Sequence, residues 1–185
     1  VDGSVDPVRD KEIIDTELQL KDLETVENRI KRVEKIAQVG GDKNARVEYD
    51  VLLAYREALM QGKSARSVQF ESKEEQKAAK GLFLLTAKPV LYVCNVDEAS
   101  AATGNHYVEK VREAVSEENA EVLVLAAQTE ADIAELETYE ERQMFLQDVG
   151  LEESGCNRLI KAAYKRLELE TFITAGEMEV KAWTY

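Results

Sequence analysis

The sequence of 185 residues contains few residues that break or cross-link a chain: two prolines, nine glycines and two cysteines. With 44% apolar and 33% charged residues, this scarcity predicts a folded, helix-rich protein rather than a disordered one. Cys94 and Cys156 lie far apart in the sequence, and Cys94 falls in a predicted buried strand. We therefore expect reduced thiols and a cytoplasmic location.

Other scarcities exclude whole classes of function. The single histidine, His106, cannot build a histidine-based metal site or catalytic triad, and we expect it at the surface, at a helix start. No apolar run approaches the ~20 residues that span a bilayer, so no membrane partner is expected. The net charge of −13 argues against a large non-specific nucleic-acid surface, and DNA is not an expected partner.

The most informative stretch is Lys88–Glu98. A proline precedes the apolar run Val90–Cys94, which predicts a strand buried on both faces, as in a parallel sheet. The run stops at Asn95, and acidic side chains follow. In open α/β sheets, ligands bind outside the carboxyl ends of the strands, so this loop is a candidate ligand site. The alternative is a strand that ends in an ordinary acidic turn.

The spacing of this loop indicates a purine base. An Asn amide both donates and accepts hydrogen bonds, and a carboxylate three residues later can accept from ring N–H and amino groups. Proteins that bind GTP use Asn-Lys-x-Asp in this way. Here Val96 replaces the lysine, and Glu98 replaces the aspartate with a side chain one methylene longer. The longer side chain weakens the case for guanine and makes adenine plausible.

A long helix is predicted over about residues 10–38, with Asp6-Pro7 suited to a helix start, and a return helix over about residues 44–61. Gly40-Gly41 is expected to end the first and Asp42 to cap the second. Apolar residues at heptad spacing predict a coiled-coil helical hairpin: Leu23, Val26, Ile30, Val33 and Ala37 in the first helix, and Val47, Val51, Ala54, Tyr55, Ala58 and Leu59 in the second.

A third helix, about residues 72–85, begins with the capping pattern Ser72 to Glu75, and its apolar end Leu82–Leu85 is expected to dock onto the domain that holds the strand. A helix over about 105–116 and a second apolar run over 122–127 complete a βαβ unit. Helices follow at about 139–148 and 156–167, the latter with a core-facing stripe that includes Ile160 and Leu167. Residues 171–185 alternate as a β-hairpin.

Asn-x-x-Glu after Lys-Pro-x-x-Tyr is the pattern of the YchF or Obg-like ATPases, and this sequence resembles that family along essentially its whole length. Further stretches carry the resemblance in the same order. They are Val1–Pro7, Glu12–Leu18, Gly40–Lys43, Glu130–Leu136 and Thr174–Thr184, the last being the most specific.

The resemblance implies an α/β fold: part of a P-loop NTPase parallel sheet, an inserted coiled-coil hairpin and the start of a small β-rich TGS domain. The implied divisions are 1–17 and 88–170 for the nucleotide-binding domain, 18–87 for the insertion and 171–185 for the TGS start. Asn95, Val96, Glu98, Ala126 and Ala127 would contact the base, although Ala126 replaces a commoner serine. Glu130 is expected to cap the following helix rather than touch ligand.

A nucleotide hydrolase of this family also needs Gly-x-x-x-x-Gly-Lys-[Ser/Thr] and Asp-x-x-Gly, and neither motif is found here. Gly62-Lys63-Ser64 lacks the first glycine and follows a helix. We therefore expect a central fragment of a larger protein that hydrolyses ATP, or both ATP and GTP, with Mg²⁺ and associates with ribosomes. The fragment alone is expected to be inactive and to bind no nucleotide tightly. The alternative is a non-catalytic acidic helical hairpin that binds protein partners, with Lys31, Arg32 and Lys35 as a small basic patch.

Overall fold

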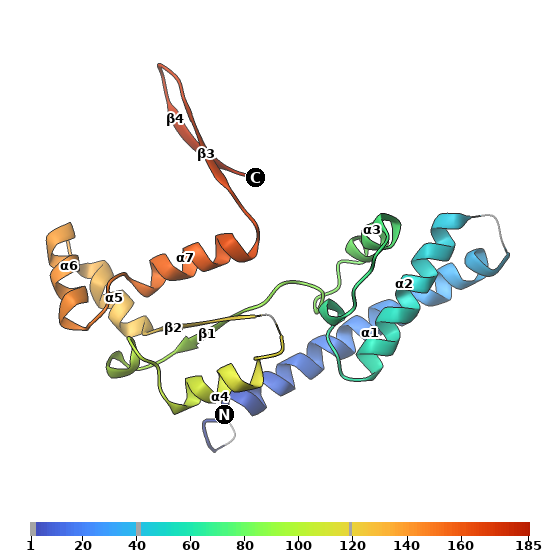
Figure 1. Ribbon diagram of the computed structural model, residues 1–185, viewed down its shortest axis with the longest axis horizontal. Helices are drawn as coiled ribbons and strands as arrows, with labels where there is room; N and C mark the ends of the chain where they lie inside the picture. Colours follow the sequence, from blue (N-terminus) through green and yellow to red (C-terminus); the bar gives the residue numbers. More distant parts are fainter. Residues whose placement is uncertain (1–2, 40–41, 119) are drawn as a thin grey trace. The chain divides into compact units, whose positions relative to one another are not determined.

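The computed structural model describes residues 3–39, 42–118 and 120–185. The chain forms two compact units: a helical unit, Val8–Pro89, and an α/β unit built from Val1–Pro7 and Val90–Tyr185 (Figure 1). In the described ranges, no helix is long and apolar enough to cross a membrane.

The helical unit begins with a hairpin of two helices. Its elements are α1 (Pro7–Val39), α2 (Lys43–Met60), the 3₁₀ turn η1 (Ala65–Ser67) and α3 (Lys73–Gly81). Asp42 caps α2 as predicted, since its carboxylate accepts from the N–H groups of Asn44 at 2.9 Å and Ala45 at 3.2 Å. The expected glycine cap at Gly40-Gly41 lies outside the described residues. The expected domain border near Leu18 falls inside α1, which is continuous there.

The predicted apolar seam forms the core of the helical unit. From α1, Val26, Ile30, Val33 and Ala37 are buried, and Leu23 packs against them. Their partners on α2 include Val51, Leu52, Tyr55 and Leu59, whereas Val47 is only half-buried. The heptad spacing therefore identified the packed faces of both helices, although it did not single out Leu52, which is fully buried.

Helix α3 begins as predicted but ends early. Ser72 and Glu75 form the expected reciprocal capping box, and the helix stops at Gly81. Phe83 then adopts a left-handed φ of 52°, which turns the chain out of helical geometry. Leu84 consequently enters the core of the helical unit, while Phe83 is 82% exposed. Leu82 and Leu84, which were expected to dock onto the strand domain, therefore pack within the helical unit instead.

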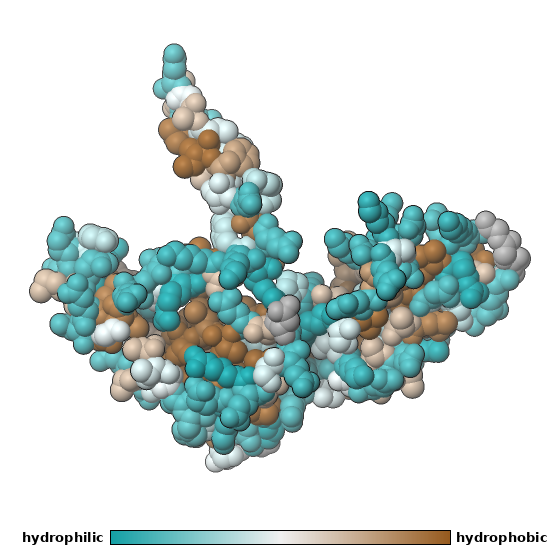
Figure 2. All heavy atoms as spheres, in the orientation of Figure 1, coloured by the Kyte–Doolittle hydropathy of each residue, from teal (hydrophilic) through white to brown (hydrophobic). Residues whose placement is uncertain are grey.

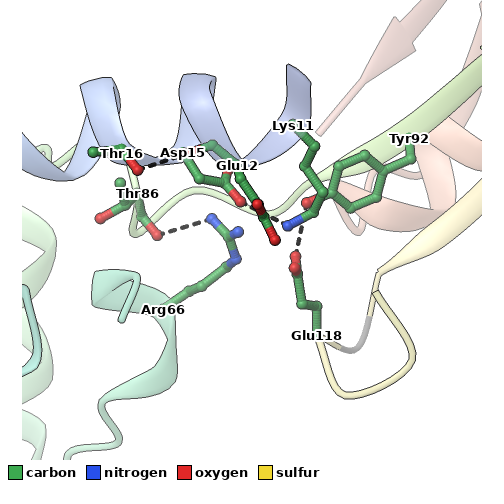
Figure 3. A network of polar contacts seen from close by, with 8 residues as sticks. All are labelled: Lys11, Glu12, Asp15, Thr16, Arg66, Thr86, Tyr92 and Glu118. Carbon is green, nitrogen blue, oxygen red and sulfur yellow. Dashed lines mark hydrogen bonds and ion pairs between the residues drawn. The ribbon is translucent and has the colours of Figure 1, made fainter. Parts of the chain in front are cut away.

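A buried carboxylate fixes the segment that follows α3. Asp22 on α1, 2% exposed, accepts hydrogen bonds from the N–H of Leu85 at 2.8 Å and from the N–H and hydroxyl of Thr86, each at 2.7 Å. The Thr86 hydroxyl oxygen in turn accepts from the Ala65 N–H at 2.9 Å. Figure 3 shows Arg66 reaching the main-chain oxygen of Thr86, at 3.2 Å. Asp22 thus ties α1 to two later turns of the chain.

The α/β unit is a βαβ unit with further helices and a terminal hairpin. Its elements are β1 (Leu91–Asn95), the 3₁₀ turn η2 (Glu98–Ser100), α4 (His106–Ala114), β2 (Glu121–Leu125), α5 (Ala127–Glu135), α6 (Tyr139–Asp148), α7 (Gly155–Arg166), β3 (Thr171–Ala175) and β4 (Val180–Thr184). Strands β1 and β2 pair in parallel, with Leu91 opposite Glu121 and Asn95 opposite Leu125. The predicted βαβ unit is therefore confirmed, and His106 is exposed at the start of α4 as expected.

Two predictions of burial in this unit were wrong. Val93 in β1 is 43% exposed, because among the described residues β1 pairs only with β2 and the helix packed on it is α7. On α7, Ala162 is buried, but Ile160 and Leu167 are 56% and 57% exposed. The apolar stripe of α7 is therefore only partly covered.

The carboxyl-terminal hairpin forms as predicted. Strands β3 and β4 pair antiparallel, and Phe172 lies opposite Trp183. The Trp183 indole N–H donates to the Thr174 hydroxyl at 2.9 Å. Every residue of both strands is exposed, and Figure 2 shows apolar side chains at the hairpin surface.

Candidate functional site

The candidate site is the edge formed by the carboxyl ends of β1 and β2. Register places Asn95, the last residue of β1, opposite Leu125, the last residue of β2. The Val96 N–H donates to the Leu125 oxygen at 2.9 Å, which continues the ladder one step beyond β1. The candidate loops of both strands therefore start side by side, where ligands bind in α/β sheets.

Asn95 connects the two loops directly. Its side-chain oxygen accepts a hydrogen bond from the Ala127 N–H at 2.9 Å. Because the donor is an N–H group, the amide must present its oxygen there, so its NH₂ group points elsewhere. That NH₂ group has no partner among the described residues, and Asn95 is exposed. A free, oriented donor at this edge can pair with an acceptor on a ligand.

The two acidic residues of the β1 loop have different surroundings. Asp97 caps η2, because its carboxylate accepts from the Ser100 N–H at 2.9 Å. Glu98 begins η2, is exposed and pairs with no other residue that the structure describes. Of the two carboxylates, Glu98 is the one left available to bind a ligand.

The β2 side of the site is a helix start rather than a loop. Ala126 is 3% exposed and packs with Ala101, Ile133 and Leu146, whereas Ala127 is exposed and begins α5. The Ala126 side chain is therefore shielded from solvent. The sequence carries no local signal for this helix start, because the α5 amino terminus receives its side-chain acceptor from Asn95, 32 residues earlier.

Glu130 has a structural role, though not the predicted one. It lies in the first turn of α5, and its carboxylate accepts from the N–H groups of Gly155 at 2.5 Å and Cys156 at 3.1 Å. It therefore caps α7 and not the helix that directly follows β2. Gly155 is required there, since a Cβ atom would lie 2.8 Å from the Cβ of Leu125 and 2.9 Å from Glu130 Oε1. This contact fixes α7 against the end of β2.

Neither cysteine is activated as a nucleophile. Burial raises the pKa of the Cys94 thiol, which immediately precedes Asn95. The hydrogen bond with Glu130 raises the pKa of the Cys156 thiol. Both raised pKa values favour the protonated thiol over the nucleophilic thiolate near neutral pH.

No group of three or more histidine, cysteine, aspartate or glutamate side chains in the described ranges could hold a metal ion. What the edge offers is a main-chain ladder, one oriented amide and one free carboxylate. This set suits a flat heterocycle with donors and acceptors on its rim.

A parallel βαβ unit with this edge, joined to a helical hairpin, defines the class: an α/β fold with a helical insertion. No family model matches the chain. The chain is 52% identical over 187 residues to the ribosome-binding ATPase YchF of Bacillus subtilis, and 46% identical over 184 residues to that of Escherichia coli O157:H7. It is 36% identical to Obg-like ATPase 1 of Caenorhabditis elegans.

The solved structure of the Schizosaccharomyces pombe YchF GTPase matches the whole chain with a TM-score of 0.87 at 27% identity, and the match covers 50% of that structure. The chain is therefore a homologue of the YchF and Obg-like ATPase family along its whole length. It spans about half the length of these relatives: 50% of the two bacterial proteins and 47% of the nematode one.

Proposed function

We propose that this chain supplies the base-recognition edge and the helical insertion of a YchF-type nucleotide-binding protein. The complete protein hydrolyses ATP, or both ATP and GTP, and associates with ribosomes. The proposed divisions are 1–17 and 88–170 for the nucleotide-binding domain, 18–87 for the helical insertion and 171–185 for the start of the TGS domain. Homology over the full chain to proteins named ribosome-binding ATPase supports the proposal.

The observation that carries base recognition is which hydrogen-bonding groups at this edge already have partners and which are free. The side-chain oxygen of Asn95 accepts a hydrogen bond from the Ala127 N–H, and its NH₂ group is free. The Val96 N–H donates to the Leu125 oxygen. The Val96 carbonyl is therefore the main-chain group that can face the base. The Glu98 carboxylate, in the same loop, has no partner among the described residues, whereas the Asp97 carboxylate caps η2. These groups together can bind the edge of adenine.

Replacing Glu98 by aspartate tests this assignment in the full-length protein. Shortening the side chain by one methylene restores the residue type that reads guanine, so the ratio of GTP to ATP affinity should rise about tenfold. Competition binding of both nucleotides measures the ratio. The matched control is Asp97→Glu, one residue away, which should leave the ratio unchanged because Asp97 caps η2. An unaltered ratio in the Glu98→Asp protein would remove Glu98 from base recognition.

The 185-residue chain alone should not turn over nucleotide, because its sequence contains no Gly-x-x-x-x-Gly-Lys-[Ser/Thr] phosphate cradle. A phosphate-release assay on the purified chain with ATP and Mg²⁺ measures this directly. Steady turnover that follows the 20.8 kDa species through size-exclusion chromatography would contradict the expectation.

A further inference from the structure

The helical unit contains a groove of about 960 Å³ between the α1–α2 hairpin and α3. Its lining includes five basic and three acidic side chains, a net charge of +2, in a chain whose net charge is −13. The groove thus concentrates positive charge in an acidic protein. Lys31 and Lys35, on the same helix, are not part of the lining.

Some of these charges already have partners. Lys21 pairs with Glu24 at 2.7 Å, and Arg29 pairs with Glu48 at 2.5 Å across the hairpin. Arg32, Lys73 and Lys77 are exposed and form no ion pair with any residue in the described ranges. These three cations are free to pair with an anionic partner.

The rest of the lining indicates the kind of partner. Val47, Ala78 and Leu82 are half-buried apolar residues that form part of the groove wall. Glutamates are interspersed among the cations, and they repel a continuous run of phosphates. Apolar contacts flanked by separate cations instead suit an amphipathic helix, whose apolar face enters a groove while its flanking carboxylates meet basic side chains. Peptide therefore fits better than nucleic acid.

We propose that this groove binds an amphipathic segment of a partner protein that carries carboxylates beside its apolar face. The proposal goes beyond nucleotide binding and concerns the helical unit alone. Arg32, Lys73 and Lys77 pair with the carboxylates, and Val47 and Ala78 contact the apolar face.

The test uses a fluorescein-labelled helical peptide of about four turns, with a leucine stripe flanked by glutamates. The same peptide with lysine in place of glutamate, and labelled polyuridylate RNA, are the comparison probes. Fluorescence polarisation with the chain in the absence of nucleotide separates this test from the proposed nucleotide function. The glutamate peptide should bind, and the lysine peptide and the RNA should bind at least tenfold more weakly.

Charge reversal locates the binding. The double variant Arg32→Glu, Lys77→Glu should weaken binding of the glutamate peptide about tenfold, since each exposed pair contributes up to about a fivefold effect. Lys31→Glu, Lys35→Glu is the matched control, with the same charge change outside the groove, and should stay within about twofold. Val47→Ser should also weaken binding, because it removes an apolar contact.

Circular dichroism melting confirms that each variant is folded, and Arg32→Gln, Lys77→Gln replaces the reversal if that variant fails. Three results would overturn the proposal. The glutamate peptide could fail to bind; the control pair could lose as much affinity as the groove pair; or polyuridylate could bind more tightly and lose its affinity in the groove variant, which would make the groove an RNA site.

Discussion

Replacing Asp22 by alanine should destabilise the helical unit by about 3 kcal/mol. The carboxylate is buried and accepts hydrogen bonds from the Leu85 N–H, the Thr86 N–H and the Thr86 hydroxyl, at 2.7 to 2.8 Å. Removing it leaves two buried donors of Thr86 and the partly buried Leu85 N–H without this acceptor. Each buried donor costs about 1–3 kcal/mol unless water reaches it. Urea unfolding followed by far-ultraviolet circular dichroism measures the loss.

Two further variants separate this role from a general effect of charge. Asp22→Asn keeps one acceptor oxygen but turns an NH₂ group toward a donor, so its stability should fall between wild type and Asp22→Ala. Asp50→Ala removes an exposed carboxylate of the same unit, paired with Arg46 at 3.2 Å, and should change stability by about 0.5 kcal/mol or less. Equal losses in Asp22→Ala and Asp50→Ala would show that the buried network contributes nothing.

Asp22 also illustrates where sequence reasoning stops. The caps that were predicted, Asp42 on α2 and Ser72 with Glu75 on α3, act within three residues of the helix that they begin. Such caps leave a short pattern in the sequence. The Asp22 contacts join residues 63 and 64 positions apart, and no local pattern encodes them.

The candidate site follows the same division. Strand polarity and the position of Asn95 at the end of β1 could be predicted, because they depend on a contiguous apolar run. The start of α5 could not, since Ala126 offers no capping side chain and the acceptor comes from Asn95. The role of Glu130 was assigned to the wrong helix for the same reason: its partners are 25 and 26 residues away.

The burial of individual apolar side chains was also difficult to predict from the sequence. An apolar run on a strand or helix shows that a face can be buried, but a pattern does not say whether a neighbour covers it. In the helical unit the heptad residues found their partners within the hairpin. On β1 and α7, Val93, Ile160 and Leu167 remain substantially exposed, because no described element covers these faces.

Helix α7 packs closely against the end of β2 at Gly155, which leaves no room for a side chain there. Gly155→Ala should destabilise the α/β unit by about 2–3 kcal/mol. The added methyl carbon would lie 2.8 Å from the Cβ of Leu125 and 2.9 Å from Glu130 Oε1, so either the end of β2 or the capping carboxylate must move. Displacing Glu130 also weakens the cap on the Gly155 and Cys156 N–H groups.

Gly81→Ala is the matched control, because it makes the same chemical change at the last residue of α3, where an added Cβ meets nothing within 4 Å. Alanine there should be neutral or stabilise by about 0.5 kcal/mol, through lower entropy of the unfolded chain. Urea unfolding reports both variants, and hydrogen exchange of the α7 amides localises the effect of Gly155→Ala. If both substitutions were equally tolerated, and α7 exchanged at the wild-type rate, then the close packing of α7 on β2 would not hold in solution. The attachment of α7 beside the candidate base site would then require another explanation.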